Sequence, residues 1–215
     1  MLKDRNYWSA FYAKNQEPFE HSLFATFCLK YFKKDFSILE LGCGNGRDAL
    51  FFAKKGFKVK ALDLCENEIR FLNDNYKNKN LEFFCVDFCN FLDDKKYDGI
   101  YSRFTLHSIS KDQQDNLFKN ISCLLKEKGL LCIEARGKKN SLFGKGKRVV
   151  NNNGGGGGGY CFIFEEHFRR FLDFDELKQS VKDLGLKILY AKEDKGFAPF
   201  KNEDDYFIRL IAQNN

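Results

Sequence analysis

The sequence predicts an α/β fold, built on a mostly parallel sheet with helices on both faces. From residue 36 onward, short apolar segments typical of buried strands alternate with amphipathic segments of helical periodicity. Consecutive strand–helix–strand units of this kind place parallel strands side by side. A glycine-rich segment after the first strand, and acidic residues at the ends of the next two, indicate that the carboxyl edge of the sheet binds a ligand.

Five strands and three helices are expected between residues 36 and 134. Each strand is a short apolar run, and each helix repeats its apolar residues at helical spacing. The expected strands are Phe36–Leu41, Phe57–Leu62, Leu81–Val86, Tyr97–Ser102 and Gly129–Glu134. The expected helices are Arg47–Lys55, Glu66–Tyr76 and about Asp112–Lys126.

The C-terminal region is expected to complete the sheet at one side. A helix is predicted near Asp173–Leu184, followed by strands near Leu186–Lys192 and Tyr206–Ala212. A loop that contains Pro199 joins the two strands, so we predict that they form an antiparallel, hairpin-like pair.

Two segments fall outside the alternating pattern. Residues 1–34 are rich in aromatic side chains and are predicted to form two helices, separate from a domain at residues 35–215. Residues 136–160 are rich in Gly, Lys and Asn and include six consecutive glycines, Gly154–Gly159. Because glycine holds neither a helix nor a strand well, we expect a mobile insertion, either disordered or acting as a lid.

Composition favours one globular domain without a membrane segment. A length of 215 residues suits one domain, and a hydrophobic content of 43% supports a sizeable core. The apolar runs are shorter than the ~20 residues that a membrane-spanning helix needs. Met1–Arg5 is not an apolar stretch of the signal-peptide type. We therefore expect a cytoplasmic protein with no membrane partner.

The net charge and the cysteine spacing argue against a nucleic-acid-binding protein and against a metal site. A net charge of +6 is too mild to require a nucleic-acid partner, and it suits a small anionic substrate. The eight cysteines contain no Cys-x-x-Cys pair, and the closest two are Cys85 and Cys89. Most lie in apolar runs, as Cys28 and Cys132 do. We predict mostly buried cysteines in a reducing compartment and no metal site.

A glycine-rich loop follows the first expected strand. Glycine lets the backbone turn sharply and approach a ligand closely, and N–H groups at the start of a helix favour an anionic group such as a carboxylate. Dinucleotide-binding enzymes share this context, but their fingerprint has a small residue where Arg47 stands here. The G-x-G-x-G spacing and the acid before it also separate the two classes. The predicted cofactor contacts in this loop are Glu40, Gly42, Cys43, Gly44, Asn45 and Gly46.

Two further acids stand at strand ends where a nucleoside would need them. Asp63 ends the second strand, and its carboxylate is suited to accept hydrogen bonds from both ribose hydroxyls. Asp87 follows the third strand and is placed to accept from the exocyclic amine of adenine, with Phe88 packing on the ring. Leu64, beside Asp63, joins the predicted cofactor contacts. A carboxylate at a strand end is also a common helix cap, and that alternative stays open for Asp87.

Over roughly residues 36–135 the chain resembles the class I methyltransferases that depend on S-adenosylmethionine (SAM). The glycine motif of that family maps onto Glu40–Gly46, its ribose-binding acid onto Asp63 and its adenine-binding acid onto Asp87. Its fourth-strand motif maps onto Tyr97–His107. The resemblance implies a three-layer, Rossmann-like fold with sheet order 3-2-1-4-5-7-6, an antiparallel strand seven, and SAM as the cofactor.

Methyl transfer from a sulfonium is an in-line displacement, in which the protein mainly aligns the acceptor and excludes water. A base is needed only when the acceptor must lose a proton. Arg103 and His107 follow the fourth strand, in a stretch that lines the methionine part of SAM in resembling enzymes. Both are predicted catalytic residues: Arg103 also contacts the cofactor, and His107 is the candidate base. A structural hydrogen-bonding role is the alternative for His107.

Basic residues after the fifth strand are candidates for binding the acceptor. Arginine forks bind phosphate or carboxylate groups in a bidentate manner. A pocket for an anion is therefore one interpretation of these arginines, and a solvated basic loop is the other. Independently of these arginines, the aromatic side chains of residues 1–34 are predicted to fold over the cofactor as a helical lid, and simple core packing by an amphipathic helix is the alternative. The predicted substrate-binding residues are Tyr7, Tyr12, His107, Arg136, Tyr160, Arg169 and Arg170.

The acceptor is expected to be a small molecule. The sequence contains neither the Asp/Asn-Pro-Pro-aromatic motif of amino-methylating DNA enzymes nor the Pro-Cys nucleophile of base-carbon methyltransferases, and no RNA-binding appendage is recognisable. Three stretches resemble methyltransferases of bacterial surface-polysaccharide clusters: Glu165–Phe171, Lys195–Pro199 and Asp205–Arg209. This resemblance implies a phosphate-bearing or phosphoramidate acceptor, or a sugar, of capsule biosynthesis.

Other functions stay compatible with the sequence. They are methylation of another small metabolite, SAM binding without catalysis, and a dinucleotide-dependent oxidoreductase, which the glycine spacing disfavours. The run Gly154–Gly159 adds a hypothesis about expression. A chain so rich in Lys, Asn, Phe and Ile suggests an AT-rich gene, in which six glycine codons form a guanine tract that slips during replication. Expression is then expected to be phase-variable.

Overall fold

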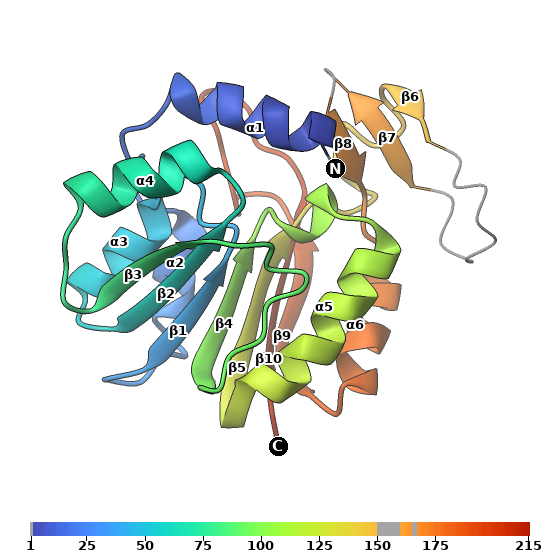
Figure 1. Cartoon of the computed structure of the whole chain (residues 1–215). Helices are drawn as coiled ribbons and strands as arrows, with labels where there is room; N and C mark the ends of the chain where they lie inside the picture. Colours follow the sequence, from blue (N-terminus) through green and yellow to red (C-terminus); the bar gives the residue numbers. More distant parts are fainter. Residues whose placement is uncertain (1, 150–159, 165–166) are drawn as a thin grey trace.

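A seven-stranded sheet forms the centre of the molecule. The structure is a computed structural model, and it describes residues 2–149, 160–164 and 167–215. The strand order is β3-β2-β1-β4-β5-β10-β9 (Figure 1). Strands β3, β2, β1, β4 and β5 pair in parallel, whereas β10 is antiparallel to both neighbours. The strands span Ser37–Leu41 (β1), Lys58–Asp63 (β2), Leu81–Cys85 (β3), Tyr97–Arg103 (β4), Leu125–Ala135 (β5), Lys187–Asp194 (β9) and Phe207–Gln213 (β10).

Numbered within this sheet alone, the strand order is 3-2-1-4-5-7-6, and strand seven is antiparallel. The predicted order and the antiparallel C-terminal pair are therefore confirmed. The largest shift in boundaries occurs where helix and strand meet at residues 124 and 125. The helix ends at Leu124 and β5 begins at Leu125, so the strand starts before the expected Gly129.

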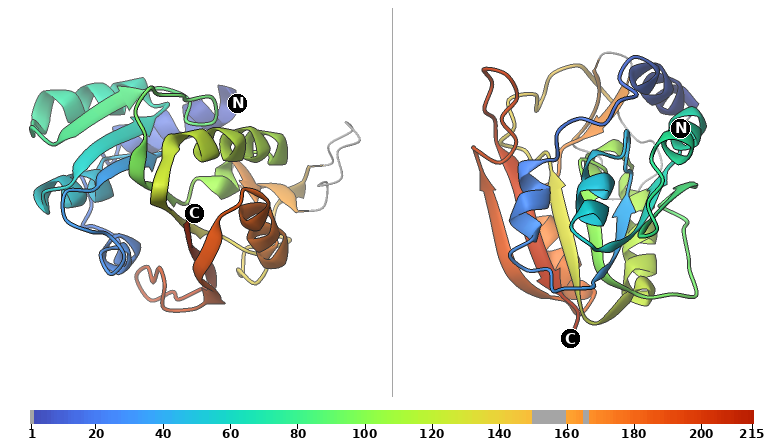
Figure 2. Two further views of the ribbon diagram at one scale, coloured as in Figure 1. Left: turned by 90° about the horizontal axis from the view of Figure 1, so that it is seen from below. Right: turned by 90° about the vertical axis from the view of Figure 1, so that its left-hand side faces the viewer.

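Helices cover both faces of the sheet, as the two views in Figure 2 show. Buried side chains of α2, α3 and α4 pack on one face, and those of α5 and α6 pack on the other. The predicted three-layer arrangement is therefore confirmed. The helices span Leu2–Ala13 (α1), Leu23–Cys28 (α2), Arg47–Lys54 (α3), Glu66–Asn75 (α4), Lys111–Leu124 (α5) and Phe174–Asp183 (α6), with a short 3-10 helix at Leu106–Ser108 (η1).

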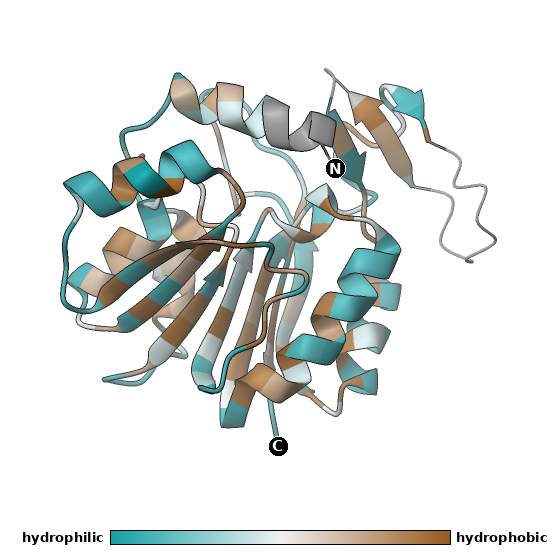
Figure 3. Cartoon of the chain, viewed as in Figure 1, coloured by the Kyte–Doolittle hydropathy of each residue, from teal (hydrophilic) through white to brown (hydrophobic). Residues whose placement is uncertain are grey.

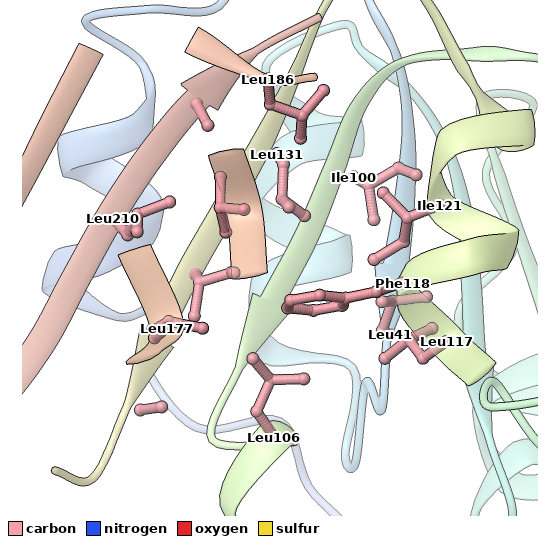
Figure 4. Close-up of a cluster of buried hydrophobic side chains, with 14 of the residues drawn as sticks. Leu41, Ile100, Leu106, Leu117, Phe118, Ile121, Leu131, Leu177, Leu186 and Leu210 are labelled. Atoms are coloured by element: carbon pink, nitrogen blue, oxygen red, sulfur yellow. The ribbon is translucent and has the colours of Figure 1, made fainter. Parts of the chain in front are cut away.

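Each face of the sheet packs its own cluster of apolar side chains. Ile100, Ile121 and Leu177 belong to the cluster beneath α5 and α6 (Figure 4). Aromatic rings are prominent on the other face, where the centroids of Phe52 and Tyr101 lie 5.1 Å apart. Figure 3 shows the hydrophobic residues concentrated on the central strands. Burying one side chain of this size stabilises the fold by about 1.5–3 kcal/mol, so the two clusters hold the strand ends in place.

The helix α1 lies across the carboxyl edge of the sheet, above the strand ends in Figure 1 and in the right-hand view of Figure 2. It contacts α4 at one end and a strand of a second, smaller sheet at the other. The helix α2 instead buries Phe24, Ala25 and Cys28 in the main core. The two helices expected in residues 1–34 therefore occupy different places: α1 covers the edge, and α2 is part of the core.

The second sheet corrects the prediction for residues 136–160. It is antiparallel, in the order β6-β7-β8, with β6 at Lys147–Arg148, β7 at Cys161–Phe164 and β8 at His167–Arg170. Residues 136–149 are not a free loop, because Gly137 forms a bridge with Leu172 and Ser141 donates to Asp205. The run Gly154–Gly159 lies outside the described residues, as do Glu165 and Glu166.

Two properties of the described chain bear on its predicted environment. None of its helices is both long and apolar enough to cross a lipid bilayer. The eight cysteines all lie in the described residues and form no disulfide bond, and all are buried except Cys85 and Cys123. Burial of most cysteines agrees with the interpretation of these residues as small apolar side chains. The cytoplasmic location stays a prediction.

A buried carboxylate ties α2 to the start of α3. Asp48, which is 2% exposed, accepts hydrogen bonds from the backbone N–H of Ser22 at 2.7 Å and from the Ser22 hydroxyl at 2.8 Å. The hydroxyl of Tyr101 in β4 donates to the same carboxylate at 2.8 Å. Because α3 begins directly after the glycine-rich loop, this network also anchors the loop.

Replacing this carboxylate is expected to destabilise the fold. Asp48→Ala leaves the buried N–H of Ser22 and one of the two hydroxyls of Ser22 and Tyr101 without an acceptor, at a cost of about 2–3 kcal/mol in the free energy of unfolding. Urea denaturation monitored by circular dichroism measures the change. Asp74→Ala is a matched control, because Asp74 is an exposed acid in α4. Equal stability of the two variants would contradict the role of this network.

Candidate active site

The glycine-rich loop between β1 and α3 needs glycine for two reasons. Gly42 and Gly44 adopt left-handed backbone angles, with φ of 68° and 53°. Neighbouring groups also leave no room for side chains. A Cβ at Gly42 would stand 2.5 Å from Cγ2 of Thr105, and a Cβ at Gly44 would overlap the hydroxyl of Tyr12. The loop therefore needs glycine at both positions because Thr105 and Tyr12 approach its backbone closely; the predicted approach to a ligand stays a prediction.

The carboxylate of Asp63 holds this loop in position. One oxygen accepts from the backbone N–H of Gly44 and the other from that of Cys65, both at 2.9 Å. Burial raises the pKa of Asp63, and the two N–H groups oppose that rise. Each carboxylate oxygen has a second lone pair, so Asp63 keeps acceptor capacity for the predicted ribose hydroxyls.

Glu40 is a buried acceptor that lacks a partner in the described structure. Its side chain is 4% exposed, and Oε2 makes no hydrogen bond with any described residue. Burial and then Asp48 raise the pKa of Glu40 well above its usual value, while Arg103 opposes the rise. An unsatisfied buried carboxylate is costly. A ligand that donates a hydrogen bond or carries positive charge therefore fits this position.

Three further predicted cofactor contacts, Leu64, Asp87 and Phe88, follow the strands β2 and β3. Asp87 accepts from the backbone N–H of Cys89 at 2.9 Å and from the amide of Asn90 at 2.7 Å, so it does stabilise a turn. Phe88 lies 3.5 Å from the position of a Cβ at Gly42, which places its ring beside the glycine loop. Leu64 is 38% exposed. Phe88 therefore borders the loop, and the cofactor contacts of Asp87, Phe88 and Leu64 stay predictions.

Two loop side chains are already used within the protein. Asn45, which is 2% exposed, donates its amide to the carbonyl oxygens of Glu17 at 3.0 Å and Asn15 at 3.4 Å. The thiol of Cys43 is buried and lies 3.8 Å from the Gly44 carbonyl oxygen. Asn45 therefore fastens the segment after α1 to the loop. The cofactor contact predicted for Asn45 stays a prediction.

Aromatic residues of α1 connect the glycine loop with the second sheet. Tyr12 covers Gly44, and Trp8 stacks on Tyr12 with a centroid distance of 6.0 Å. Tyr7, which directly precedes Trp8, stacks on His167 of β8 with a centroid distance of 4.1 Å. Burial, followed by the charge of Asp63, raises the pKa of Tyr12 well above its usual value, so Tyr12 stays neutral. One helix thus contacts both predicted sides of the site.

Arg103 is held by a buried carboxylate that the sequence did not single out. Its Nε donates to Glu134 at 3.0 Å, and Nε of Arg209 donates to the other oxygen of Glu134 at 2.6 Å. Arg209 also donates to the carbonyl oxygen of Phe197. Burial raises the pKa of Glu134, which is fully buried, and both arginines oppose the rise. This pairing fixes the guanidinium of Arg103 at the end of β4, beside the glycine loop.

His107 lies in η1 and is 6% exposed. Its Nδ1 accepts from the backbone N–H of Arg136 at 3.3 Å, so the neutral ring carries its proton on Nε2. Burial, followed by the charges of Arg136 and Arg169, lowers the pKa of His107 well below its usual value. The structure therefore makes His107 a neutral hydrogen-bond donor. This arrangement favours the structural alternative over the base that we had predicted.

A positive cluster surrounds His107. Nη1 of Arg136 donates to Asn140 at 3.3 Å, and no ion pair of Arg136 occurs among the described residues. Burial and the charge of Arg169 lower the pKa of Arg136 to about 10, opposed by Asp205. Arg169 donates from Nε to Nε2 of His167 at 2.7 Å. Arg136 and Arg169 held this close together favour an anionic ligand.

Two predicted substrate contacts have other roles in the structure. Arg170 is 7% exposed and donates to the carbonyl oxygens of Leu106 at 3.0 Å and Ile109 at 2.9 Å, so it fastens β8 to η1. Tyr160 lies beneath Nζ of Lys138, 3.6 Å from its ring centroid. Arg170 supports the loop of His107 from behind, and the structure shows no contact between Tyr160 and the positive cluster.

Comparison with known proteins agrees with this geometry. Residues 38–129 match the family described as "Methyltransferase domain". The match covers β1 to the start of β5, and it includes the glycine loop, Asp63 and Asp87.

Two curated proteins resemble the chain in sequence. A probable SAM-dependent methyltransferase, TehB of Haemophilus influenzae, is 30% identical over 88 residues, which are 39% of this chain and 30% of that protein. Malonyl-[acyl-carrier protein] O-methyltransferase 1 of Ilyobacter polytropus is 32% identical over 173 residues, which are 79% of this chain and 60% of that protein. The chain thus spans less than two thirds of the length of these relatives.

A solved structure shows the same fold. The 1,6-didemethyltoxoflavin-N1-methyltransferase of Burkholderia thailandensis, with 1,6-didemethyltoxoflavin and S-adenosylhomocysteine bound, superposes with a TM-score of 0.66. The similarity covers 89% of this chain and 76% of that one at 17% sequence identity. The Rossmann-like methyltransferase fold predicted from the sequence is therefore confirmed.

The close contact between Gly44 and Tyr12 is testable without a ligand. Gly44→Ala is expected to push Tyr12 off the loop, because the new Cβ would overlap its hydroxyl. Trp8, the only tryptophan of the chain, stacks on Tyr12, so its fluorescence emission should shift. Gly56→Ala is the control, since Gly56 also has a positive φ, of 92°, but open space around the added Cβ. An unchanged emission in Gly44→Ala would refute the contact.

Proposed function

We propose that this protein is a SAM-dependent methyltransferase whose acceptor is a small anionic molecule. The cofactor part of the proposal is supported by the glycine loop, by Asp63 and by the unpaired Oε2 of Glu40. The acceptor part is supported chiefly by one observation. A cluster of cations around Arg136 and His107 lies at the same sheet edge as the glycine loop, without an adjacent ion-pair partner for Arg136 among the described residues.

The residues around the glycine loop suit the parts of SAM. Its sulfonium supplies an activated methyl group. Asp63 would accept from the ribose hydroxyls, and Asp87 with Phe88 would border the adenine. Glu40, which lacks a partner in the described structure, would face the positively charged methionine end. Arg103, fixed by Glu134, would bind the methionine carboxylate.

The acceptor side needs no titrating base in this proposal. An anionic oxygen attacks a methyl group without first losing a proton, so alignment is the main task of the protein. Arg136 would bind the anion, and His107 would orient it by donating from Nε2. The fixed tautomer of His107 supports this role, because Nδ1 already accepts from the Arg136 backbone.

The chemical class of the acceptor can be narrowed further. The stretches that resemble enzymes of surface-polysaccharide clusters favour a phosphoramidate or a phosphate-bearing sugar of a capsule. A carboxylate is the second candidate. One relative is named for O-methylation of a malonyl group, which ends in a carboxylate. Both candidates share a negative charge that the arginine cluster would recognise. The helix α1, with Tyr7 and Tyr12, would close over the two ligands as a lid.

Cofactor binding tests the first part of the proposal. Isothermal titration calorimetry should show binding of SAM and S-adenosylhomocysteine and none of NAD. Asp63→Ala is expected to weaken SAM binding by about 1–3 kcal/mol, because the ribose loses its acceptor. Asp74→Ala, an exposed acid on α4, should bind as the wild type does. Binding of NAD alone would overturn the cofactor assignment.

Methyl transfer from labelled SAM tests the acceptor. A panel should contain sugar phosphates, phosphoramidates, short dicarboxylates and uncharged sugars, and we expect transfer to a charged member. Arg136→Gln should lower kcat/KM for that acceptor by about tenfold or more, equivalent to about 1.4 kcal/mol. Arg148→Gln removes an exposed arginine of the same region and serves as the control. Preference for uncharged sugars, or equal rates in both variants, would contradict an anionic acceptor.

The expression hypothesis has a separate test. If the codons of Gly154–Gly159 form a guanine tract, its length should vary among colonies grown from one cell. A change that is not a multiple of three nucleotides would shift the frame and end synthesis of the protein. Sequencing the tract from many colonies measures this variation. An invariant tract would argue against phase variation and would leave the proposed enzymatic function untouched.

A further inference from the structure

Glu68 is a buried acid close to the glycine loop. It lies in the first turn of α4 and is 1% exposed. Leu72, one turn later on the same helix face, lies 3.0 Å from the position of a Cβ at Gly46. Because residues four apart share a helix face, Glu68 lies on the face of α4 that is turned to the glycine loop. An acid in the first turn of a helix is usually solvated, and this one is not.

The surroundings of Glu68 do not neutralise it. Its Oε1 is buried without a hydrogen-bond partner among the described residues. Among the described side chains, the titratable groups that interact with it are Asp63 from β2, Tyr12 from α1, Cys43 from the glycine loop and Tyr76 at the end of α4, none of which is a cation. Burial and then the charge of Asp63 raise the pKa of Glu68 to about 7. Burying an acceptor without a partner costs free energy, unless a ligand donates a hydrogen bond to it.

We propose that Glu68 is a further cofactor-binding residue, which accepts a hydrogen bond from the nucleoside of SAM beside Asp63. The proposal rests on SAM being the cofactor. Asp63 accepts one backbone N–H at each oxygen and keeps one lone pair on each, and the unpartnered Oε1 of Glu68 adds a further acceptor for the nucleoside hydroxyls. Two adjacent carboxylates also repel phosphate. The site therefore takes a nucleoside with free 2′ and 3′ hydroxyls and rejects one phosphorylated there.

This role implies that Glu68 releases a proton when the cofactor binds. A hydroxyl donates to the ionised form of Glu68, so binding lowers its pKa from the value of about 7 in the empty site. Affinity then rises with pH through this range, and the proton is released. The pKa values of Tyr12 and Cys43 are raised well above their usual values, so these two groups stay neutral over the same range.

Calorimetry of the whole chain with S-adenosylhomocysteine tests the proposal. This probe has no sulfonium, so a change in affinity cannot come from that charge. For the wild type we expect about a tenfold gain in affinity between about pH 6 and about pH 8, as follows for one group with a pKa near 7. Titrations at about pH 7 in two buffers with different ionisation enthalpies should show release of about half a proton.

The variant Glu68→Gln keeps the size of the side chain but cannot ionise. We expect it to lose the pH dependence and to bind about tenfold more weakly than the wild type at about pH 8. The control is Glu66→Gln, because Glu66 lies in the same turn, is exposed and pairs with Arg70. It should keep the wild-type profile. Adenosine 3′-phosphate should not bind the wild type, whereas adenosine should.

Each failure has a distinct meaning. If the wild type binds neither SAM nor S-adenosylhomocysteine at any pH, the proposed cofactor is wrong and this inference falls with it. If the wild type binds but Glu68→Gln shows the same affinity and pH profile, only the inference about Glu68 is overturned. The buffer measurement uses the wild type alone, so absence of proton release overturns the inference even if the variant does not fold.

Discussion

The bond between the Asp63 carboxylate and the Gly44 backbone N–H, 2.9 Å long, is the contact on which the site depends. It joins the end of β2 to the turn that follows β1, and so fixes the loop in its left-handed shape. Because the loop carries no side chain at Gly44, Tyr12 of α1 can rest directly on its backbone. The position of the covering helix therefore follows from the conformation of the glycine loop.

Charge divides the covered edge into two halves. Buried carboxylates of Glu40, Asp63 and Glu68 lie around the glycine loop, and each has a pKa raised first by burial. Around His107 the groups are cationic, with Arg136 and Arg169 close together. A positively charged methyl donor suits the acidic half, and an anionic acceptor suits the basic half. The helix α1 spans both halves.

Local sequence patterns predicted the strands, the loop and the acids that follow the strands, because each depends on residues close together in the chain. Distant contacts were not predictable in this way. Glu134 and Arg209 face each other in the antiparallel register of β5 and β10, and no local pattern reveals that pairing. Glu68 resembles an ordinary acid in the first turn of a helix until the tertiary structure buries it.

The two arginines of β8 show most clearly what local sequence patterns could not predict. The sequence predicted that both would bind the acceptor, but neighbouring residues of a strand point to opposite sides. Arg169 bonds with His167 beside the positive cluster, whereas Arg170 turns inward to the carbonyl groups of Leu106 and Ile109. The sequence alone thus determined the fold class and the position of the glycine-rich loop, which rest on periodicity and a compact motif. Only the tertiary structure decided which side chains share a buried space, because strand register and helix packing set the direction of each one.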